Sequence, residues 1–186
     1  MDESVDPGEN ALRQLTAHMT AYQAGSLEAF EALYAALAPP VLAYLASLCR
    51  DRDRARDLLQ ETFLQLHRSR RTYRPELPVR PWVFTIARHV WLMDRRYHNR
   101  RPRSDQELTD VPVPAEVEGL ADRDRMRRAL DAVLPDRREA LLLHHVWGFS
   151  FAEVAQMIGI RADAAKLRSS RGMADLRRLL LEDNRG

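Results

Sequence analysis

The apolar residues of this 186-residue chain recur at intervals of three and four, which predicts a succession of amphipathic helices. One such face precedes Gly25, and another follows Ser26, a residue suited to cap a helix N-terminus. The pair Pro39-Pro40 predicts a break, after which a further helix begins near Val41. No stretch shows a convincing period of two, so the pattern predicts an all-α protein.

The clearest apolar stripe follows a possible N-cap at Asp51 or Asp53. Its members recur at offsets 0, 3, 4, 7, 8 and 11, and they are Ala55, Leu58, Leu59, Thr62, Phe63 and Leu66. This stripe predicts a helix that packs against the preceding ones. Asp57, Gln60 and Glu61 lie largely off the stripe, and composition alone indicates an ordinary solvated acidic face.

A proline-bounded loop and a basic helix come next. The three prolines of Tyr73–Pro81 exclude a regular helix, and the pattern predicts a helix over Trp82–Arg96. Five arginines then fall within nine residues: Arg95, Arg96, Arg100, Arg101 and Arg103. Cations favour a helix C-terminus, but this number exceeds what capping needs. Beside Trp, Tyr and His, the cluster predicts a phosphate-binding patch with aromatic rings for stacking on unpaired bases.

Periodicity disappears between two predicted domains. Residues 102–121 are acidic and contain three prolines, which is typical of a flexible linker. They separate an N-terminal helical domain, 10–101, from a C-terminal domain, 122–184. We therefore predict two small helical domains joined by a flexible linker.

The second domain carries a helix-turn-helix pattern. Ser150 and Glu153 fit a capping box, and a short helix from Phe151 ends at Gly159, which suits a left-handed C-cap. A basic helix begins by Asp163. A short helix, a tight turn and a basic helix are typical of DNA-binding domains, although a structural helical hairpin shares much of this pattern.

The composition and the motifs of the chain narrow its possible functions. The net charge is only +2, no apolar run reaches the length of a membrane span, and the acidic N-terminus is unlike a secretory signal. The single Cys49 offers no disulfide or metal cluster, and the adjacent His144 and His145 point to different faces. We find no Gly-rich phosphate loop or nucleophile elbow. We therefore expect a cytoplasmic protein without membrane insertion, catalytic residues, metal or cofactor.

Three motifs in register resemble those of extracytoplasmic-function (ECF) sigma factors, the promoter-recognition subunits of bacterial RNA polymerase. The first runs from Ala55 to Leu64, the second from Trp82 to Arg96, and the third from Leu134 to Arg178. Their order and the intervening linker agree with the family. The chain departs from it at His89, where Asn is usual, and at 163–165, where Gly-Thr-Val is usual.

The resemblance implies a role for each set of residues. The largest-subunit clamp of core polymerase would meet Asp57, Leu58, Gln60, Glu61 and Leu64. The minus-ten DNA, including a base flipped into the loop, would meet Tyr73, Arg74, Arg80, Trp82, Arg88, His89, Arg95, Arg96 and Arg100. The minus-thirty-five DNA would meet Arg161, Lys166, Arg168 and Arg171. Further implied partners are the polymerase flap, promoter DNA and an anti-sigma factor.

Two alternative functions stand beside the hypothesis that the chain recognises promoters as a subunit of RNA polymerase. A stand-alone helix-turn-helix regulator would bind duplex DNA without polymerase, but this leaves the first two motifs unexplained. An enzyme would need a catalytic constellation, and the sequence contains no motif of that kind.

Overall fold

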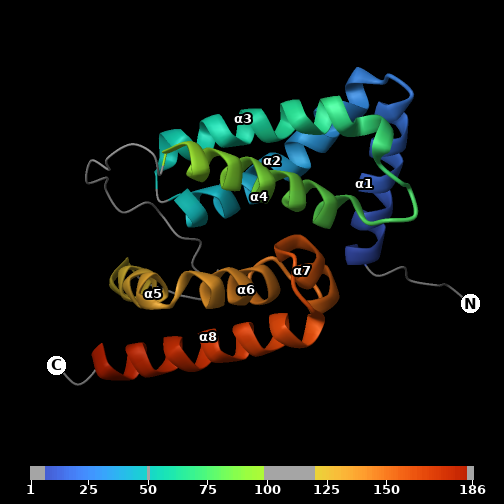
Figure 1. The fold of residues 1–186 in the computed structure, drawn as a ribbon. Coiled ribbons are helices and arrows are strands. Elements are labelled where there is room, and N and C mark those ends of the chain that lie inside the picture. Colours follow the sequence, from blue (N-terminus) through green and yellow to red (C-terminus); the bar gives the residue numbers. More distant parts are fainter. Residues whose placement is uncertain (1–6, 50, 99–119, 184–186) are drawn as a thin grey trace, which may run out of the picture.

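The computed structural model describes residues 7–49, 51–98 and 120–183, and those residues form two packed groups of helices (Figure 1). The N-terminal group contains α1 (Pro7–Gln23), α2 (Leu27–Cys49), α3 (Arg52–Ser69), the short 3-10 helix η1 (Arg70–Thr72) and α4 (Val79–His98). The C-terminal group contains α5 (Leu120–Ala132), α6 (Pro135–His145), α7 (Phe151–Ile158) and α8 (Ala162–Asp183). The described part of the chain has no strand, which confirms the all-α prediction. Arg100 and residues 102–119 of the predicted linker lie outside the described residues.

α2 corrects the prediction of a break at Pro39-Pro40, because it continues through both prolines. The carbonyl groups that lose their helical partners there belong to Ala35 and Ala36, whose exposure leaves room for water. Apolar side chains buried on both sides of the prolines hold the helix in place. α2 also corrects the expectation that no apolar run reaches the length of a membrane span, because it is long and apolar enough to cross a membrane by length and composition alone. Here it packs as a core helix within the N-terminal group.

α3 confirms the predicted stripe, since all six stripe residues are buried. The carboxylate of Asp51 caps the helix by accepting hydrogen bonds from the backbone N–H groups of Asp53 and Arg54, both at 3.0 Å. The start of α4 differs from the prediction: it begins at Val79, so Pro81 lies inside its first turn. A proline is tolerated there because the first N–H groups of a helix have no intrahelical partner.

The C-terminal group is built around the contact between α6 and α8. Gly172 makes this close approach possible: a Cβ added there would lie 2.9 Å from the carbonyl oxygen of Arg137. α7 begins with the predicted capping box of Ser150 and Glu153 and ends at Gly159, whose φ of 72° is left-handed. The helix-turn-helix arrangement of α7 and α8 therefore forms as the sequence predicts.

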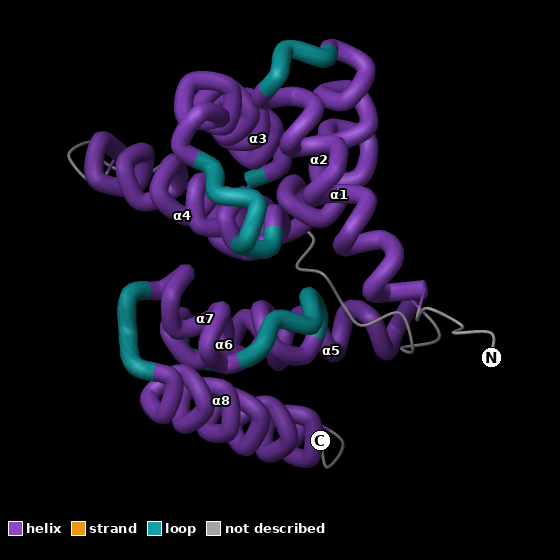
Figure 2. Tube along the Cα trace, turned by 90° about the vertical axis from the view of Figure 1, so that its right-hand side faces the viewer, coloured by secondary structure: helices purple, strands orange, loops and turns teal. Residues whose placement is uncertain are grey.

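The two groups of helices are in direct contact. α4 packs on α7, and α6 and α7 lie between the N-terminal helices and α8 (Figures 1 and 2). Four aromatic rings meet at this contact, with centroids 4.9 to 6.1 Å apart: Tyr44, Phe84, Trp147 and Phe149. All four are buried, so the contact has an apolar centre. α8 lies on the far side of the C-terminal group from α2, α3 and α4.

Candidate functional site

The outer face of α3 presents the acidic residues that the sequence singles out. Asp57 and Gln60 are exposed, and Glu61 is half-buried. Glu61 accepts a hydrogen bond from Gln65 at 2.7 Å, which orients its carboxylate along the helix. Leu64 lies on the same side of the helix and is exposed. These four residues, Asp57, Gln60, Glu61 and Leu64, form what we call the α3 face.

Leu58 does not belong to this surface, because it is buried in the core beneath it. The sequence pattern already places Leu58 on the apolar stripe, and the family resemblance alone assigned it to polymerase. Tyr34 of α2 takes an exposed position instead, with 42% of its surface accessible. Its ring lies 4.6 Å from that of Phe63, the residue before Leu64. An exposed aromatic ring therefore lies beside the α3 face.

The loop between η1 and α4 is fastened at its base. Gln23 of α1 donates hydrogen bonds to the backbone carbonyls of Arg70 at 2.7 Å and Tyr73 at 3.0 Å. The Tyr73 ring is buried, and its hydroxyl donates to the carbonyl of Leu77 at 2.5 Å. The loop thus exposes Arg74 and Leu77 from a fixed base, whereas Tyr73 acts as an internal support.

The outer side of α4 is basic and aromatic. His89 and Arg96 are exposed there. Arg95 is also exposed, but it lies about a third of a turn away, where it lines a cleft shared with α6, and its guanidinium lies over the ring of Trp91, 5.5 Å from the centroid. Trp82 is half-buried at the start of the helix, and its ring centroid lies 5.1 Å from that of Tyr73. This side of α4 can therefore offer both positive charge and ring faces to an anionic polymer.

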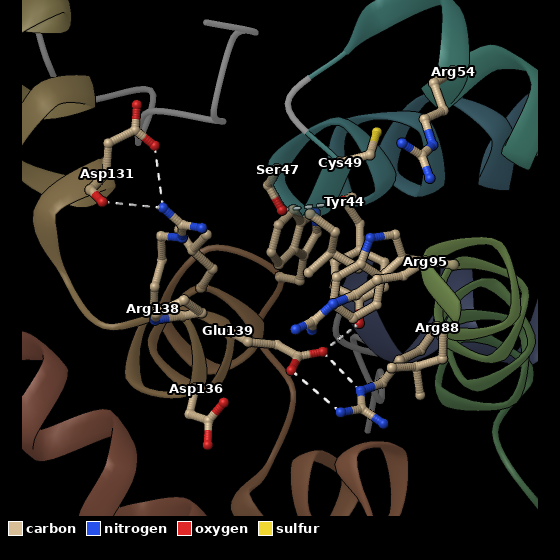
Figure 3. A pocket seen from close by; sticks show the side chains of 16 residues that line it. Tyr44, Ser47, Cys49, Arg54, Arg88, Arg95, Asp131, Asp136, Arg138 and Glu139 are labelled. Atoms are coloured by element: carbon tan, nitrogen blue, oxygen red, sulfur yellow. Dashed lines mark hydrogen bonds and ion pairs between the residues drawn. The ribbon is translucent and has the colours of Figure 1, made fainter. Parts of the chain in front are cut away.

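Arg88 is turned toward the C-terminal domain. Its Nε donates to Oε1 of Glu139 at 2.8 Å, and the Tyr44 hydroxyl donates to the same oxygen at 2.9 Å (Figure 3). Burial opposes the positive charge of Arg88, but the hydrogen bond and charge of Glu139 outweigh it, so its pKa is raised. Burial and the negative charge of Glu139 raise the pKa of Tyr44 well above its ordinary value. We call this set Tyr44, Arg88 and Glu139 the interdomain triad.

Arg80 is held at the same contact. Its guanidinium donates to the carbonyl of Trp147 at 3.1 Å and lies 5.1 Å from the centroid of the Phe149 ring. Burial lowers its pKa, and the charge of Glu153 partly opposes that effect. Two arginines that the family resemblance assigns to DNA, Arg80 and Arg88, thus contact the C-terminal domain in this structure.

A polar cleft of about 680 Å³ opens beside the interdomain triad (Figure 3). Arg54, Arg95, Arg138 and Asp131 are among its lining residues, so it carries charge of both signs. Cys49 also lines it, and burial raises the pKa of its thiol. In the part of the chain that the structure describes, no group of three or more His, Cys, Asp or Glu side chains could hold a metal.

The helix-turn-helix presents its second helix outward. Lys166 and Arg171 are exposed on α8. Arg161 forms an ion pair with Asp163, and this hydrogen-bonded pairing lowers the pKa of the Asp163 carboxyl. Arg168 lies 3.5 Å from the carboxylate of Asp136 on α6. The predicted basic residues therefore lie at the turn before α8 and along its N-terminal half, and two of them are also paired with carboxylates.

Sequence reasoning missed Tyr44 and Glu139. They lie 95 residues apart in the sequence. The periodicity of apolar residues indicates only which residues share a face of one helix, so it does not predict a contact between two distant helices. A buried carboxylate between two domains leaves no local signal.

Comparison with known proteins identifies the same segments. Residues 33–101 match the model of Sigma-70 region 2, and residues 123–176 match that of Sigma-70, region 4. The chain is 39% identical over 168 residues to the RNA polymerase sigma factor CarQ of Myxococcus xanthus, covering 88% of this chain and 96% of CarQ. It is 33% identical over 152 residues to the ECF RNA polymerase sigma factor EcfG of Rhodopseudomonas palustris, covering 80% and 83% of the two chains.

A solved structure shares the fold. The sigma factor RpoE of Bartonella quintana, in complex with the anti-sigma factor NepR, superposes with a TM-score of 0.71 at 26% identity and covers 83% of this chain and 98% of its own. CnrH in complex with the cytosolic domain of CnrY gives 0.68 at 24% identity, with coverages of 93% and 99%, which supports the fold. The order of motifs, the two family regions and these relatives lead to one conclusion: the chain belongs to the ECF sigma factors.

Proposed function

We propose that this chain binds core RNA polymerase through the α3 face and directs initiation at promoters that its two domains recognise. The observation that carries the proposal is the placement of three surfaces on one chain. The α3 face is acidic with an exposed leucine, the outer side of α4 is basic and aromatic, and α8 presents a basic helix-turn-helix. Sigma-70 regions 2 and 4 cover these surfaces in the same order.

The loop after η1 and the helix α4 would contact the minus-ten DNA. Arg74 at the exposed loop, and His89, Arg95 and Arg96 on α4, supply donors and charge for the phosphates of an opening strand. Trp82 supplies part of a ring face for an unstacked base. Tyr73 acts indirectly, because its buried ring and hydroxyl shape the loop.

Arg80 and Arg88 reach DNA in this proposal only after α4 separates from the C-terminal domain. In the present arrangement, Trp147 and Glu139 occupy their guanidinium groups. A sigma factor that contacts two promoter elements needs its domains apart, because each element meets a different domain. Opening therefore exchanges contacts within the protein for contacts with phosphate.

The C-terminal domain would contact the minus-thirty-five duplex with the exposed end of α8, where Lys166 and Arg171 lie. The second helix of a helix-turn-helix enters the major groove with its N-terminal residues on base edges. The paired Arg161 and Arg168 are placed to meet phosphates beside that groove. We further propose an anti-sigma factor as a partner, since RpoE of Bartonella quintana is found with one. The protein would act in the cytoplasm, where RNA polymerase works, and without catalysis of its own.

Transcription in vitro with core polymerase freed of sigma tests the proposal. Added protein should start transcripts from a subset of a genomic promoter library and should co-elute with core. Absence of both results would refute it. Specific duplex binding without any association with core would instead favour a stand-alone regulator, which the comparisons do not support.

A further inference from the structure

The outward side of α8 carries an exposed aliphatic residue that none of the roles above uses. The helix packs through a seam of Ala165, Ser169, Gly172 and Leu176, all buried. At 3.6 residues per turn, a residue two positions after Ala165 lies about 200° around the helix. Leu167 therefore points away from the core, and 49% of its surface is exposed.

The residues around Leu167 on the surface of α8 are short or positively charged. Asp163, Ser170 and Ala174 share its outward side, are exposed and have short side chains. Lys166 lies on one flank and Arg171 on the other, both exposed. On the Arg171 flank, Leu167 also lines a hollow with Leu134 and Pro135 at the start of α6. The exposed part of Leu167 therefore lies between two cations, with a second exposed leucine nearby. Cations at the flanks complement the phosphate strands on either side of a DNA groove.

We propose that Leu167 determines sequence preference by contacting the C5-methyl group of a thymine in the major groove. Among the bases only thymine presents a methyl group there, and apolar side chains recognise it by contact. A leucine has no hydrogen-bonding group, so it favours this methyl over the polar edges of the other bases. The inference rests on the proposed function, because it needs α8 to enter the groove of the upstream element.

The position of Leu167 along α8 fits such a contact. It lies five residues after Ala162, the first residue of the helix, which is about 7.5 Å at 1.5 Å per residue. This places Leu167 in the second turn of α8, within the N-terminal part of a recognition helix that contacts base edges. Leu181 also points outward on α8 and is 63% exposed, but it lies about 28 Å from the same start, beyond the groove. Leu181 is therefore a matched control on the same helix.

The experiment uses the full chain bound to core polymerase. Selection from a library randomised upstream first defines the preferred minus-thirty-five element. Each thymine in it is then replaced singly by deoxyuridine, which removes only the methyl group. Affinity is measured for the unaltered protein, Leu167→Ala and Leu181→Ala. Loss of one buried methyl group corresponds to about fourfold weaker binding.

The expected result is one thymine at which deoxyuridine weakens the unaltered protein and Leu181→Ala about fourfold and leaves Leu167→Ala unaffected. Equal losses in all three proteins, no loss at any thymine, or a selected element without thymine would overturn the inference while leaving upstream recognition intact. A holoenzyme that initiates transcription but selects no upstream sequence would show that α8 does not read the upstream element, and the inference about Leu167 would fail with that role. A protein that does not assemble with core would overturn the proposed function itself.

Discussion

Glu139→Gln should weaken the closed arrangement of the two domains. Gln keeps the shape of Glu and can still accept a hydrogen bond from Tyr44, but it removes the charge opposite Arg88. The side chains of Arg88 and Glu139 are only 19% and 10% exposed, so solvent screens this pair little. In the closed form the variant therefore leaves a largely buried guanidinium beside a neutral amide.

The size of the change in the free energy of domain opening depends on what surrounds Arg88 in the closed and open forms. A hydrogen bond to a charged group contributes about 1.5–3 kcal/mol, and removal of one partner of a buried pair costs about 3–5 kcal/mol. Separation of the domains lets water solvate Arg88 and so limits the penalty. We expect the free energy of domain opening to fall by about 2–3 kcal/mol, which is a 30- to 150-fold shift toward the open form.

A urea titration followed by two signals measures this change. Near-ultraviolet circular dichroism reports the ordered aromatic side chains, among them the interdomain cluster of Tyr44, Phe84, Trp147 and Phe149, and far-ultraviolet dichroism reports helix content. In the variant the near-ultraviolet transition should move to lower urea, while the loss of helix should move little. Small-angle scattering at the intermediate urea concentration should show a larger radius of gyration.

Glu182→Gln is the matched control. It removes an exposed ion pair with Arg178, 3.0 Å long and within one helix, whose contribution is about 0.3–0.5 kcal/mol. A near-ultraviolet transition that shifts no further in Glu139→Gln than in Glu182→Gln would refute the reasoning about the interdomain triad.

Three further predictions concern single surfaces and contacts. Gln60→Ala combined with Glu61→Ala should abolish co-elution with core polymerase at unchanged helix content, and unchanged affinity would contradict the role of the α3 face. Ser169→Ala should raise the free energy of unfolding of the C-terminal domain by about 1 kcal/mol in a urea titration, because the buried hydroxyl of Ser169 has no hydrogen-bond partner. A gain no larger than that of the exposed Ser170→Ala would argue against this cause. Gly172→Ala should lower that stability by about 1–3 kcal/mol, since its Cβ would lie 2.9 Å from a backbone oxygen of α6; an unchanged midpoint would show that the two helices separate without penalty.

Local patterns predicted the local structure well. The α3 stripe, the capping box of Ser150 and Glu153 and the left-handed Gly159 all appear as expected, because each depends on residues within one or two helical turns. The two errors at Pro39-Pro40 and Pro81 share a cause. A proline is unfavourable within a helix, but burial on either side of it or a place in the first turn can offset or remove the penalty.

The residues of the candidate site also fall into those that local sequence predicts and those that it does not. The exposed acidic residues of α3 and the basic residues of α4 and α8 could be read from the sequence, since they lie off the apolar stripes. Their roles came from family resemblance and stay predictions. The pairing of Arg88 with Glu139 could not be predicted, because it joins helices from two domains across 51 positions of the chain.

The outward position of α8 gives domain closure an unequal effect on the two proposed DNA contacts. α8 faces solvent in the closed chain, whereas Arg80 and Arg88 are occupied. When only a fraction of molecules is competent to bind, apparent affinity falls by that fraction. With the contacts proposed above, closure would lower the apparent affinity for melted minus-ten DNA in proportion to the closed population, whereas the affinity of α8 for duplex DNA would be unchanged.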